Sequence, residues 1–176
     1  GLLEADNGVI LDIPAGAFPA GAMVRLAALT EAEINVSPGP NFPFVAGFEF
    51  ESSAAPQIYL NVSAPLPAGT SAEAHGIVAQ VFDVYDRSML YVVDTARVIN
   101  GRLATSSPPC PGIMSKFGRY AAFLNEHQEM ALGAAILSMG TTPLPQGVSY
   151  EVHWQTDLLF TSFGFPAPFL LRQHLT

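Results

Sequence analysis

The 176-residue chain has little charge and almost no cysteine. Charged side chains make up 12% of it, about half of the roughly 25% found in typical domains. Fifteen acids against seven bases give a net charge of -8, and Lys116 is the only lysine. Binding to nucleic acid requires clusters of lysine and arginine that neutralise phosphates. The composition therefore argues against a nucleic-acid partner.

The chain also lacks a long uninterrupted apolar run. Its longest apolar stretches, residues 130–139 and 158–171, are shorter than the ~18 residues that a membrane-spanning helix needs. The second stretch also contains Pro166 and Pro168. We therefore expect no membrane span. Fifteen glycines and fifteen prolines further argue against a helical bundle.

A single cysteine, Cys110, excludes an intrachain disulfide bond. This fits a reducing compartment or a bacterial surface protein, because many surface proteins of bacteria contain almost no cysteine. The chain begins at Gly1 with no basic region and no apolar leader after it, so we expect a removed leader or a fragment. Scarce lysine and strand-like patterning favour an exported bacterial protein, extracellular or at the cell surface.

Apolar and polar residues alternate along most of the first 125 residues, which is the pattern of half-buried strands. Residues 77–85 are apolar on both faces, so we expect this strand to be central in its sheet. Asn100-Gly101 between short apolar runs predicts a tight hairpin, because both turn positions need positive φ. We predict strands near residues 9–13, 23–29, 44–50, 58–62, 77–85, 89–93, 97–99, 102–104 and 120–124. This spacing indicates an all-β antiparallel sandwich.

The character of the sequence changes after Leu124. Residues 125–129 form the most polar run, and alternation returns only around Tyr150–Trp154. We therefore divide the chain into a β-sandwich over residues 1–125 and a β-rich extension, or the start of a second unit, over residues 126–176.

The segment Gly8–Phe18 reads Gly-Val-Ile-Leu-Asp-Ile-Pro-Ala-Gly-Ala-Phe, and a second strand-like run, Met23–Leu26, follows it. This opening resembles the start of ZU5-type β-sandwich domains, which is also found in extracellular modules of bacterial surface proteins. The resemblance implies a ZU5-like or Ig-like sandwich. In it, Pro14 ends the strand, Gly16 takes positive φ in a tight turn and Phe18 is buried. No His-Phe-Ser or His-Leu-Ser string occurs, so the self-cleavage of some relatives is not implied.

Metal-binding and nucleophile patterns are weak. Asp83, Asp86 and Asp94 flank one predicted hairpin and could bind calcium, but turn hydrogen bonds explain an aspartate there equally well. Cys110 has no charged residue within four positions to activate its thiol. The histidines are far apart and lack His-x-x-x-His spacing: His75, His127, His153 and His174. We therefore predict no metal site, no cofactor and no catalytic residue.

Three pairs of glutamates are candidates for acid–base pairs: Glu31/Glu33, Glu49/Glu51 and Glu126/Glu129. On a strand, the i, i+2 spacing of the first two pairs would place both carboxyls on one face, within glycosidase range. Solvent-facing glutamates on half-buried strands explain the same spacing. Nucleophile-elbow and phosphate-loop motifs are also absent. We therefore expect a protein that is not an enzyme.

The low charge implies a surface with much neutral or apolar area, which isolated domains avoid unless partners cover it. We predict a non-catalytic structural or interaction module of an exported bacterial surface or filament-forming protein, contacting neighbouring domains or copies of itself. The alternative is a carbohydrate-binding or adhesin module, with Tyr59 and Tyr91 as stacking platforms, although cross-strand aromatic pairing explains them as well.

Residues 157–165 are β-prone and nearly uncharged, so we expect a sheet edge to cover them, within the chain or by strand addition to an adjacent subunit.

Overall fold

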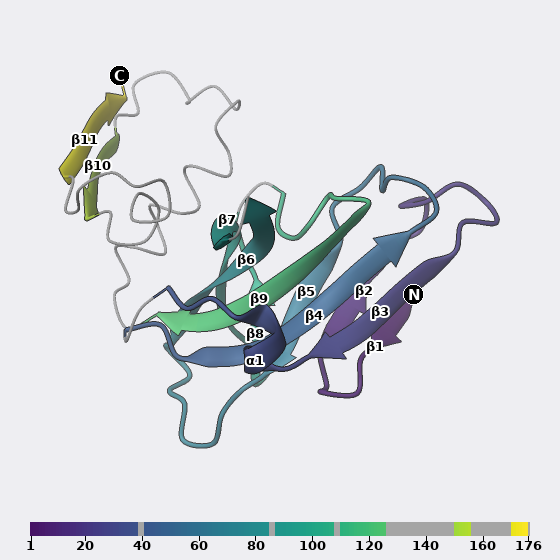
Figure 1. Ribbon diagram of the computed structural model, residues 1–176, viewed down its shortest axis with the longest axis horizontal. Coiled ribbons are helices and arrows are strands. Elements are labelled where there is room, and N and C mark those ends of the chain that lie inside the picture. The colour runs from purple at the N-terminus through teal and green to yellow at the C-terminus, as the bar shows by residue number, and fades with distance from the viewer. Residues whose placement is uncertain (39–40, 85–86, 108–109, 126–149, 156–169, 176) are drawn as a thin grey trace.

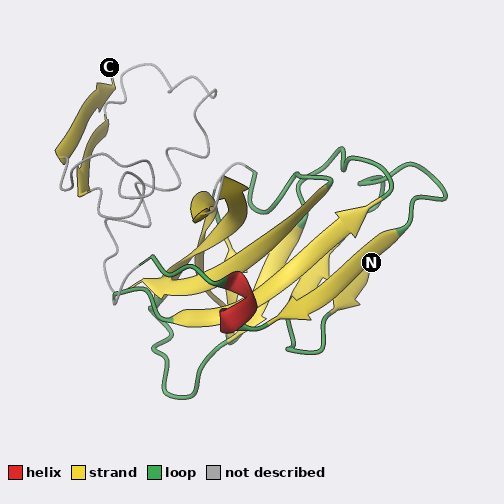
Figure 2. Cartoon of the chain, in the orientation of Figure 1, coloured by secondary structure: helices red, strands yellow, loops and turns green. Residues whose placement is uncertain are grey.

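The computed structural model describes residues 1–38, 41–84, 87–107, 110–125, 150–155 and 170–175. Within these ranges the regular secondary structure consists of strands and one short helix (Figures 1 and 2). The elements are β1 (Leu2–Glu4), β2 (Ile10–Asp12), β3 (Val24–Leu29), α1 (Glu31–Ile34), β4 (Phe44–Ser52), β5 (Asn61–Pro65), β6 (His75–Val84), β7 (Arg87–Ile99), β8 (Arg102–Thr105), β9 (Phe117–Asn125), β10 (Tyr150–Gln155) and β11 (Leu170–Leu175). In the described part of the chain, no helix has both the length and the apolar character needed to cross a bilayer.

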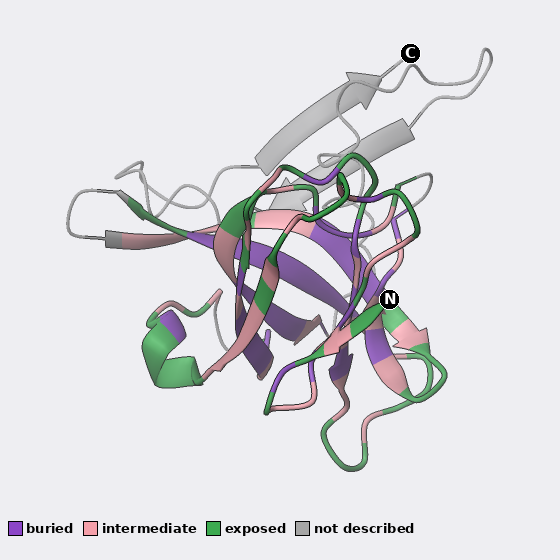
Figure 3. Cartoon of the chain, turned by 90° about the vertical axis from the view of Figure 1, so that its right-hand side faces the viewer, coloured by how far each residue is buried: buried purple, intermediate pink, exposed green. Residues whose placement is uncertain are grey.

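Nine strands form one continuous sheet in the order β1-β2-β5-β8-β7-β6-β9-β4-β3, and every neighbouring pair is antiparallel. The all-β antiparallel class is therefore confirmed. The division into two sheets of a sandwich is not, because hydrogen bonding continues from β1 to β3 and the sheet curves until it is nearly a barrel (Figure 3). Asn7, in the β1–β2 turn, shows this curvature directly, since its Nδ2 donates to the Gly47 carbonyl of β4 at 2.7 Å.

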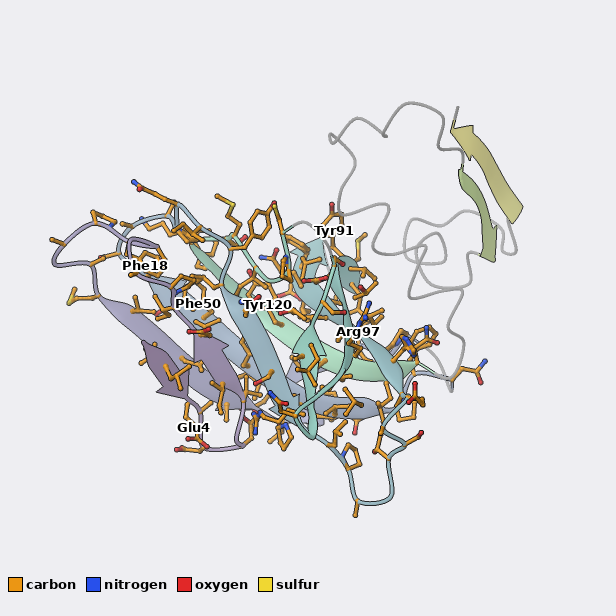
Figure 4. The ribbon with its side chains drawn as sticks, turned by 180° about the vertical axis from the view of Figure 1, so that it is seen from behind. Glu4, Phe18, Phe50, Tyr91, Arg97 and Tyr120 are labelled. Atoms are coloured by element: carbon orange, nitrogen blue, oxygen red, sulfur yellow. The ribbon has the colours of Figure 1, made fainter. Side chains whose placement is uncertain are left out.

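The interior of the curved sheet holds the main apolar core. The fully buried side chains of this core include Phe48, Phe50, Leu11 and Tyr120, which come from strands on opposite sides of the barrel. Phe50 and Tyr120 are labelled in Figure 4, where they lie among the side chains of the interior. The rings of Phe48 and Tyr120 stack with their centroids 5.0 Å apart. This core joins strands that are distant in sequence, so it stabilises the curvature of the sheet.

A second apolar cluster covers the outer face of the sheet around β6, β9 and β4. Along β6 and β9, its buried residues alternate with those that face the inner core. They include Ile77, Ala79 and Phe123, and Ile34 of α1 joins them. The helix lies outside the curved sheet (Figure 3). These strands are buried on both faces, which confirms the prediction that the run 77–85 would be central, since β6 lies between β7 and β9.

Several local predictions are confirmed or refined. Asn100 and Gly101 both have positive φ, 52° and 74°, and connect β7 to β8 in a two-residue hairpin. The runs predicted at 89–93 and at 97–99 are a single long strand, β7. The pairing of β7 with β6 shifts in register between Val78 and Ala79 of β6. This shift is a β-bulge. The run predicted from residue 58 becomes a regular strand only at Asn61.

Besides β11, which lies beyond the predicted covered segment 157–165, two elements are absent from the sequence-based prediction. The first is β1, whose three residues complete one edge of the sheet. The second is α1, which begins after Thr30 with a capping box, in which Thr30 and Glu33 bond to each other's backbone amides. The sequence signal for α1 was present, because Thr-x-x-Glu is the capping-box pattern.

The Ile-Pro-Ala-Gly-Ala turn matches its prediction in part. Gly16 has φ +79°, as expected, and a Cβ there would meet open space. The predicted burial of Phe18 is wrong, because Phe18 is half-buried and packs against the rim of the core, whereas Ala17 is fully buried. The alanine therefore fills the end of the sheet, and the cost of truncating Phe18 is below that of a full core truncation.

β10 and β11 form a separate two-stranded antiparallel sheet, with Gln155 opposite Leu170. The nine-stranded sheet ends at Asn125, the boundary predicted for the first domain. Residues 126–149 lie outside the described residues, so the division of the chain into domains stays a prediction. The covered strand predicted over 157–165 also lies outside the described residues.

Candidate interaction surface

The free edge of β3 is the most unusual polar feature of the described surface. Among the described residues, β3 pairs only with β4, in a register that places Arg25 opposite Glu51 and Ala27 opposite Glu49. The Ser53 amide donates to the Met23 carbonyl at 2.9 Å, so the odd-numbered residues of this stretch direct their backbone groups toward β4.

The even-numbered residues of β3 therefore direct their backbone N–H and C=O groups away from the sheet. These residues are Val24, Leu26 and Ala28, and none of their backbone groups has a hydrogen-bond partner among the described residues. A row of unpaired groups of this kind is a template for pairing with another strand.

The side chains at the two edges of the sheet also cover the core incompletely. Val24, Leu26 and Ala28 of β3 and Leu3 of β1 face the core but are only half-buried. The core-facing residues of the central strands β4, β6 and β9 are buried in the same cluster. Apolar side chains at the edges are thus left partly in contact with water.

A shallow hollow of about 450 Å³ lies beside the start of β3. Its lining residues are Met23, Val24, Arg25, Glu51, Ser52, Ser53 and Phe117. Met23 is 75% exposed and Phe117 is 67% exposed, which places them among the most exposed large apolar side chains of the described residues. Arg25 and Glu51, both well exposed, form an ion pair across β3 and β4 at 3.8 Å. The hollow combines two uncovered apolar side chains with a weakly held charge pair.

The predicted stacking tyrosines lie elsewhere on the sheet. Tyr91 of β7 is 54% exposed and contacts Phe82 of β6 edge to face, with ring centroids 6.3 Å apart. The register places Phe82 and Tyr91 diagonally across β6 and β7, so this is a cross-strand aromatic pair. Tyr59 lies just before β5 and is exposed. The structure does not bring the two tyrosines into one platform among the described residues, because they belong to different parts of the sheet.

Two of the three candidate calcium ligands, Asp83 and Asp94, lie on opposite faces of the sheet. Asp83 is exposed, and Ser88 donates to its carboxylate at 2.7 Å. This bond and the Arg119 guanidinium lower the pKa of Asp83 below its usual value. Asp94 is buried on the other face of the sheet, and Asp86 lies outside the described residues. No cluster of potential metal ligands occurs in the described ranges.

Asp94 instead fastens a loop to β7. Its carboxylate accepts from the backbone amide of Ser107 at 3.0 Å and from that of Gly112. The neighbouring Thr95 and Ser107 hydroxyls are 2.9 Å apart. Burial raises the pKa of Asp94, and the hydrogen bonds that it accepts oppose this shift. Calcium binds oxygen ligands, and here backbone N–H groups already occupy the carboxylate oxygens. This arrangement opposes calcium binding at Asp94.

The glutamate pairs also separate in the structure. The strand predicted for Glu31 and Glu33 is wrong, because both residues belong to α1, where an i, i+2 pair does not share a face. Hydrogen bonds from the Thr30 backbone and hydroxyl hold the pKa of Glu33 below its usual value. Glu49 and Glu51 do lie on β4 at i, i+2, and Glu51 faces Arg25. Glu126 and Glu129 lie outside the described residues.

The cysteine and the described histidines form no catalytic or metal-binding cluster in the described part of the chain. Cys110 is exposed and unpaired in a loop. His75 begins β6, whereas His153 and His174 belong to β10 and β11 and face Arg172 and Glu151 in the register. His127 lies outside the described residues. The Tyr120 hydroxyl is buried and has no hydrogen-bond partner within the described ranges, and burial raises the pKa of this phenol. Ser115 opposes that shift, but its hydroxyl does not satisfy hydrogen-bond geometry with Tyr120.

Comparison of the chain with protein-family models, with curated proteins and with solved structures finds no match.

Proposed function

We propose that this chain is a non-catalytic structural or interaction module that acts through protein–protein contacts. One observation supports the proposal most directly. The unpaired backbone groups of β3 lie beside the hollow lined by Met23 and Phe117, so free hydrogen-bonding groups and uncovered apolar side chains occupy one surface. Isolated domains avoid this combination, because it favours association of edges.

The polar groups of the described residues support the same proposal. The buried carboxylate of Asp94 binds backbone amides of its own loop, and Asp83 binds Ser88 and Arg119. These groups are engaged in structural hydrogen bonds and are not directed into a shared cleft. An enzyme would instead bring a nucleophile and a base within hydrogen-bond reach of each other.

The proposed setting is an exported bacterial surface or filament-forming protein, located outside the cell or at its surface. Scarce charge, one lysine and one cysteine support this setting. The Ile-Pro-Ala-Gly-Ala turn, with its glycine at positive φ, supports kinship with ZU5-type modules. In such a protein the partners would be neighbouring domains or further copies of the chain.

Light scattering of the purified chain over a range of concentrations tests this proposal. We expect reversible self-association, which the double variant Met23→Ser/Phe117→Ser weakens by removing the apolar lining of the hollow. Leu2→Ser is the matched control, because Leu2 is 70% exposed but lies on β1 at the opposite edge of the sheet. A wild-type chain that stays monomeric at every concentration would contradict the proposal.

A carbohydrate-binding module is the second candidate, and the exposed ring of Tyr91 beside Phe82 is the observation that favours it. Titration with soluble oligosaccharides, monitored by tyrosine fluorescence, tests this candidate. Saturable binding that Tyr91→Ala abolishes and Tyr59→Ala leaves intact would support it. An unchanged signal for the wild type would reject it.

A further inference from the structure

We infer that β3 pairs with β3 of a second copy of the chain, antiparallel and about a two-fold axis at Leu26. The inference rests on the proposed function and specifies its interface. β3 offers the outward N–H and C=O groups of Val24, Leu26 and Ala28, which alternate with residues already bonded to β4. An antiparallel partner exchanges both bonds at every second residue, so this spacing meets the requirement of a strand pair.

The sequence of β3 selects one register for this pair. With Leu26 opposite Leu26 of the second copy, Val24 lies opposite Ala28, and all three outward-bonding residues find partners. Their side chains belong to the rim of the inner core, so the pairing joins two half-buried apolar edges. On the other face, Arg25 lies opposite Ala27 of the second copy. The single charge of β3 therefore meets a small neutral side chain and not its own copy.

The neighbouring registers are poorer. A shift that centres the pair on Arg25 would place the two arginines directly opposite each other, and like charges in that position destabilise a sheet. A shift toward the end of β3 would engage Thr30, whose amide already donates to the Glu33 carboxylate at 2.7 Å. Charge and hydrogen bonding thus favour the same register.

The inferred pair also explains the exposure of Met23. This residue directly precedes β3 and shares a face with Arg25 and Ala27. In the register centred on Leu26, Met23 lies opposite Leu29 of the second copy, a half-buried residue at the rim of the outer cluster. The pairing would therefore cover a side chain that is 75% exposed in the single chain.

The opposite edge of the sheet offers less to a second copy. β1 has three residues, and its bonds to β2 through Gly1, Leu3 and Ala5 leave only Leu2 and Glu4 directed outward. Glu4 carries a charge and lies at the end of β1, away from the core (Figure 4). Short, charged edge strands are the usual protection against edge pairing. β3 is longer and carries a single charge, so it is the edge that we assign to the contact.

Ala27→Arg tests the register, because it would place a new arginine opposite Arg25 of the second copy. Within one chain the same substitution is tolerated, since Ala27 lies opposite Glu49 of β4. Two like-charge pairs in the dimer should raise its dissociation constant about tenfold. The double variant Arg25→Glu/Ala27→Arg replaces each repulsion between the two copies by an attraction and should restore association. Its melting temperature is measured as well, because the new acid lies opposite Glu51 of β4 within the chain.

A single strand pair is a small interface, so sedimentation and light scattering should cover about 10 µM to 1 mM. Association of the wild type that Ala27→Arg weakens and the double variant restores supports the β3 pair. Association that is insensitive to both variants overturns the β3 pair and leaves the proposed function standing. A wild type that remains monomeric throughout this range overturns both.

Proline substitutions provide a second, independent test. Ala28→Pro removes an outward N–H and no bond to β4, so it should abolish association while the melting temperature stays close to that of the wild type. Ala27→Pro is the matched control, because it removes an N–H that bonds to β4 and should lower the melting temperature. A folded Ala28→Pro variant that associates like the wild type would overturn the pairing.

Discussion

The centre and the edge of the nine-stranded sheet have similar apolar content but very different surroundings. β4, β6 and β9 are covered on both faces and paired on both sides. β3 is paired on one side, and its core-facing residues are half-buried. The free energy of folding is therefore concentrated in the central strands, whereas the edge retains the capacity to bind a partner.

Core truncation at the two positions should show this difference most clearly. Phe48 is fully buried and stacks on Tyr120, so Phe48→Ala should cost about 3–5 kcal/mol of unfolding free energy. Leu26 of β3 is half-buried, so Leu26→Ala should cost only about 1–2 kcal/mol. Urea unfolding of both variants measures the two costs. Equal costs would remove the distinction between centre and edge.

Substitution of Asp94 tests whether a buried polar contact contributes as much to the free energy of unfolding as the apolar core does. Asp94→Ala leaves the amides of Ser107 and Gly112 without their acceptor, and should cost about 3 kcal/mol. The corresponding loop should then exchange its amide hydrogens faster. Hydrogen-exchange mass spectrometry of the segment 105–113 measures this effect. Unchanged protection there would show that other contacts hold the loop.

The same aspartate predicts a dependence on pH. Its folded pKa is raised above the ordinary value of 3.8, so the folded state binds a proton that the unfolded state has released. The stabilising contribution of the protonated form is complete below the ordinary pKa and is lost as pH rises through the folded pKa. The wild type should therefore lose stability relative to Asp94→Ala as pH rises from about 3.8, which paired urea titrations at several pH values measure.

Tyr120→Phe should have a smaller effect, and in the stabilising direction. No described residue bonds to this buried hydroxyl, so its removal relieves a desolvation cost and should add about 1 kcal/mol to the free energy of unfolding. The melting temperature measures this gain. A loss of stability would mean that the hydroxyl has a bound partner, such as an ordered water.

Arg25→Ala should change the stability of the single chain least. Its ion pair with Glu51 is long and both side chains are well exposed, so the change should remain below about 0.5 kcal/mol. A thermal unfolding curve taken at low protein concentration measures it. A larger loss would show that the edge contributes more to the fold than its exposure indicates.

Local patterns in the sequence predicted the features that depend on neighbouring residues. The alternation of residues 44–50 defines most of β4, and Asn100-Gly101 forms the two-residue turn. The helix α1 was missed although Thr30 and Glu33 form a capping-box pattern, because Glu31 and Glu33 also satisfy the spacing of a strand face. A four-residue segment is too short for periodicity to separate these possibilities.

The all-β antiparallel class, the central position of β6 and the tight turn between β7 and β8 follow from the amino-acid sequence, because each depends on side-chain alternation or turn chemistry. Three features depend on the three-dimensional fold: the strands form one curved sheet, Asp94 is buried against the loop at Ser107, and β3 is an edge that pairs on one side only among the described residues. These features depend on which strands become neighbours. Alternation specifies the faces of a strand but not its neighbours, so strand order and free edges emerge only when the whole core has formed.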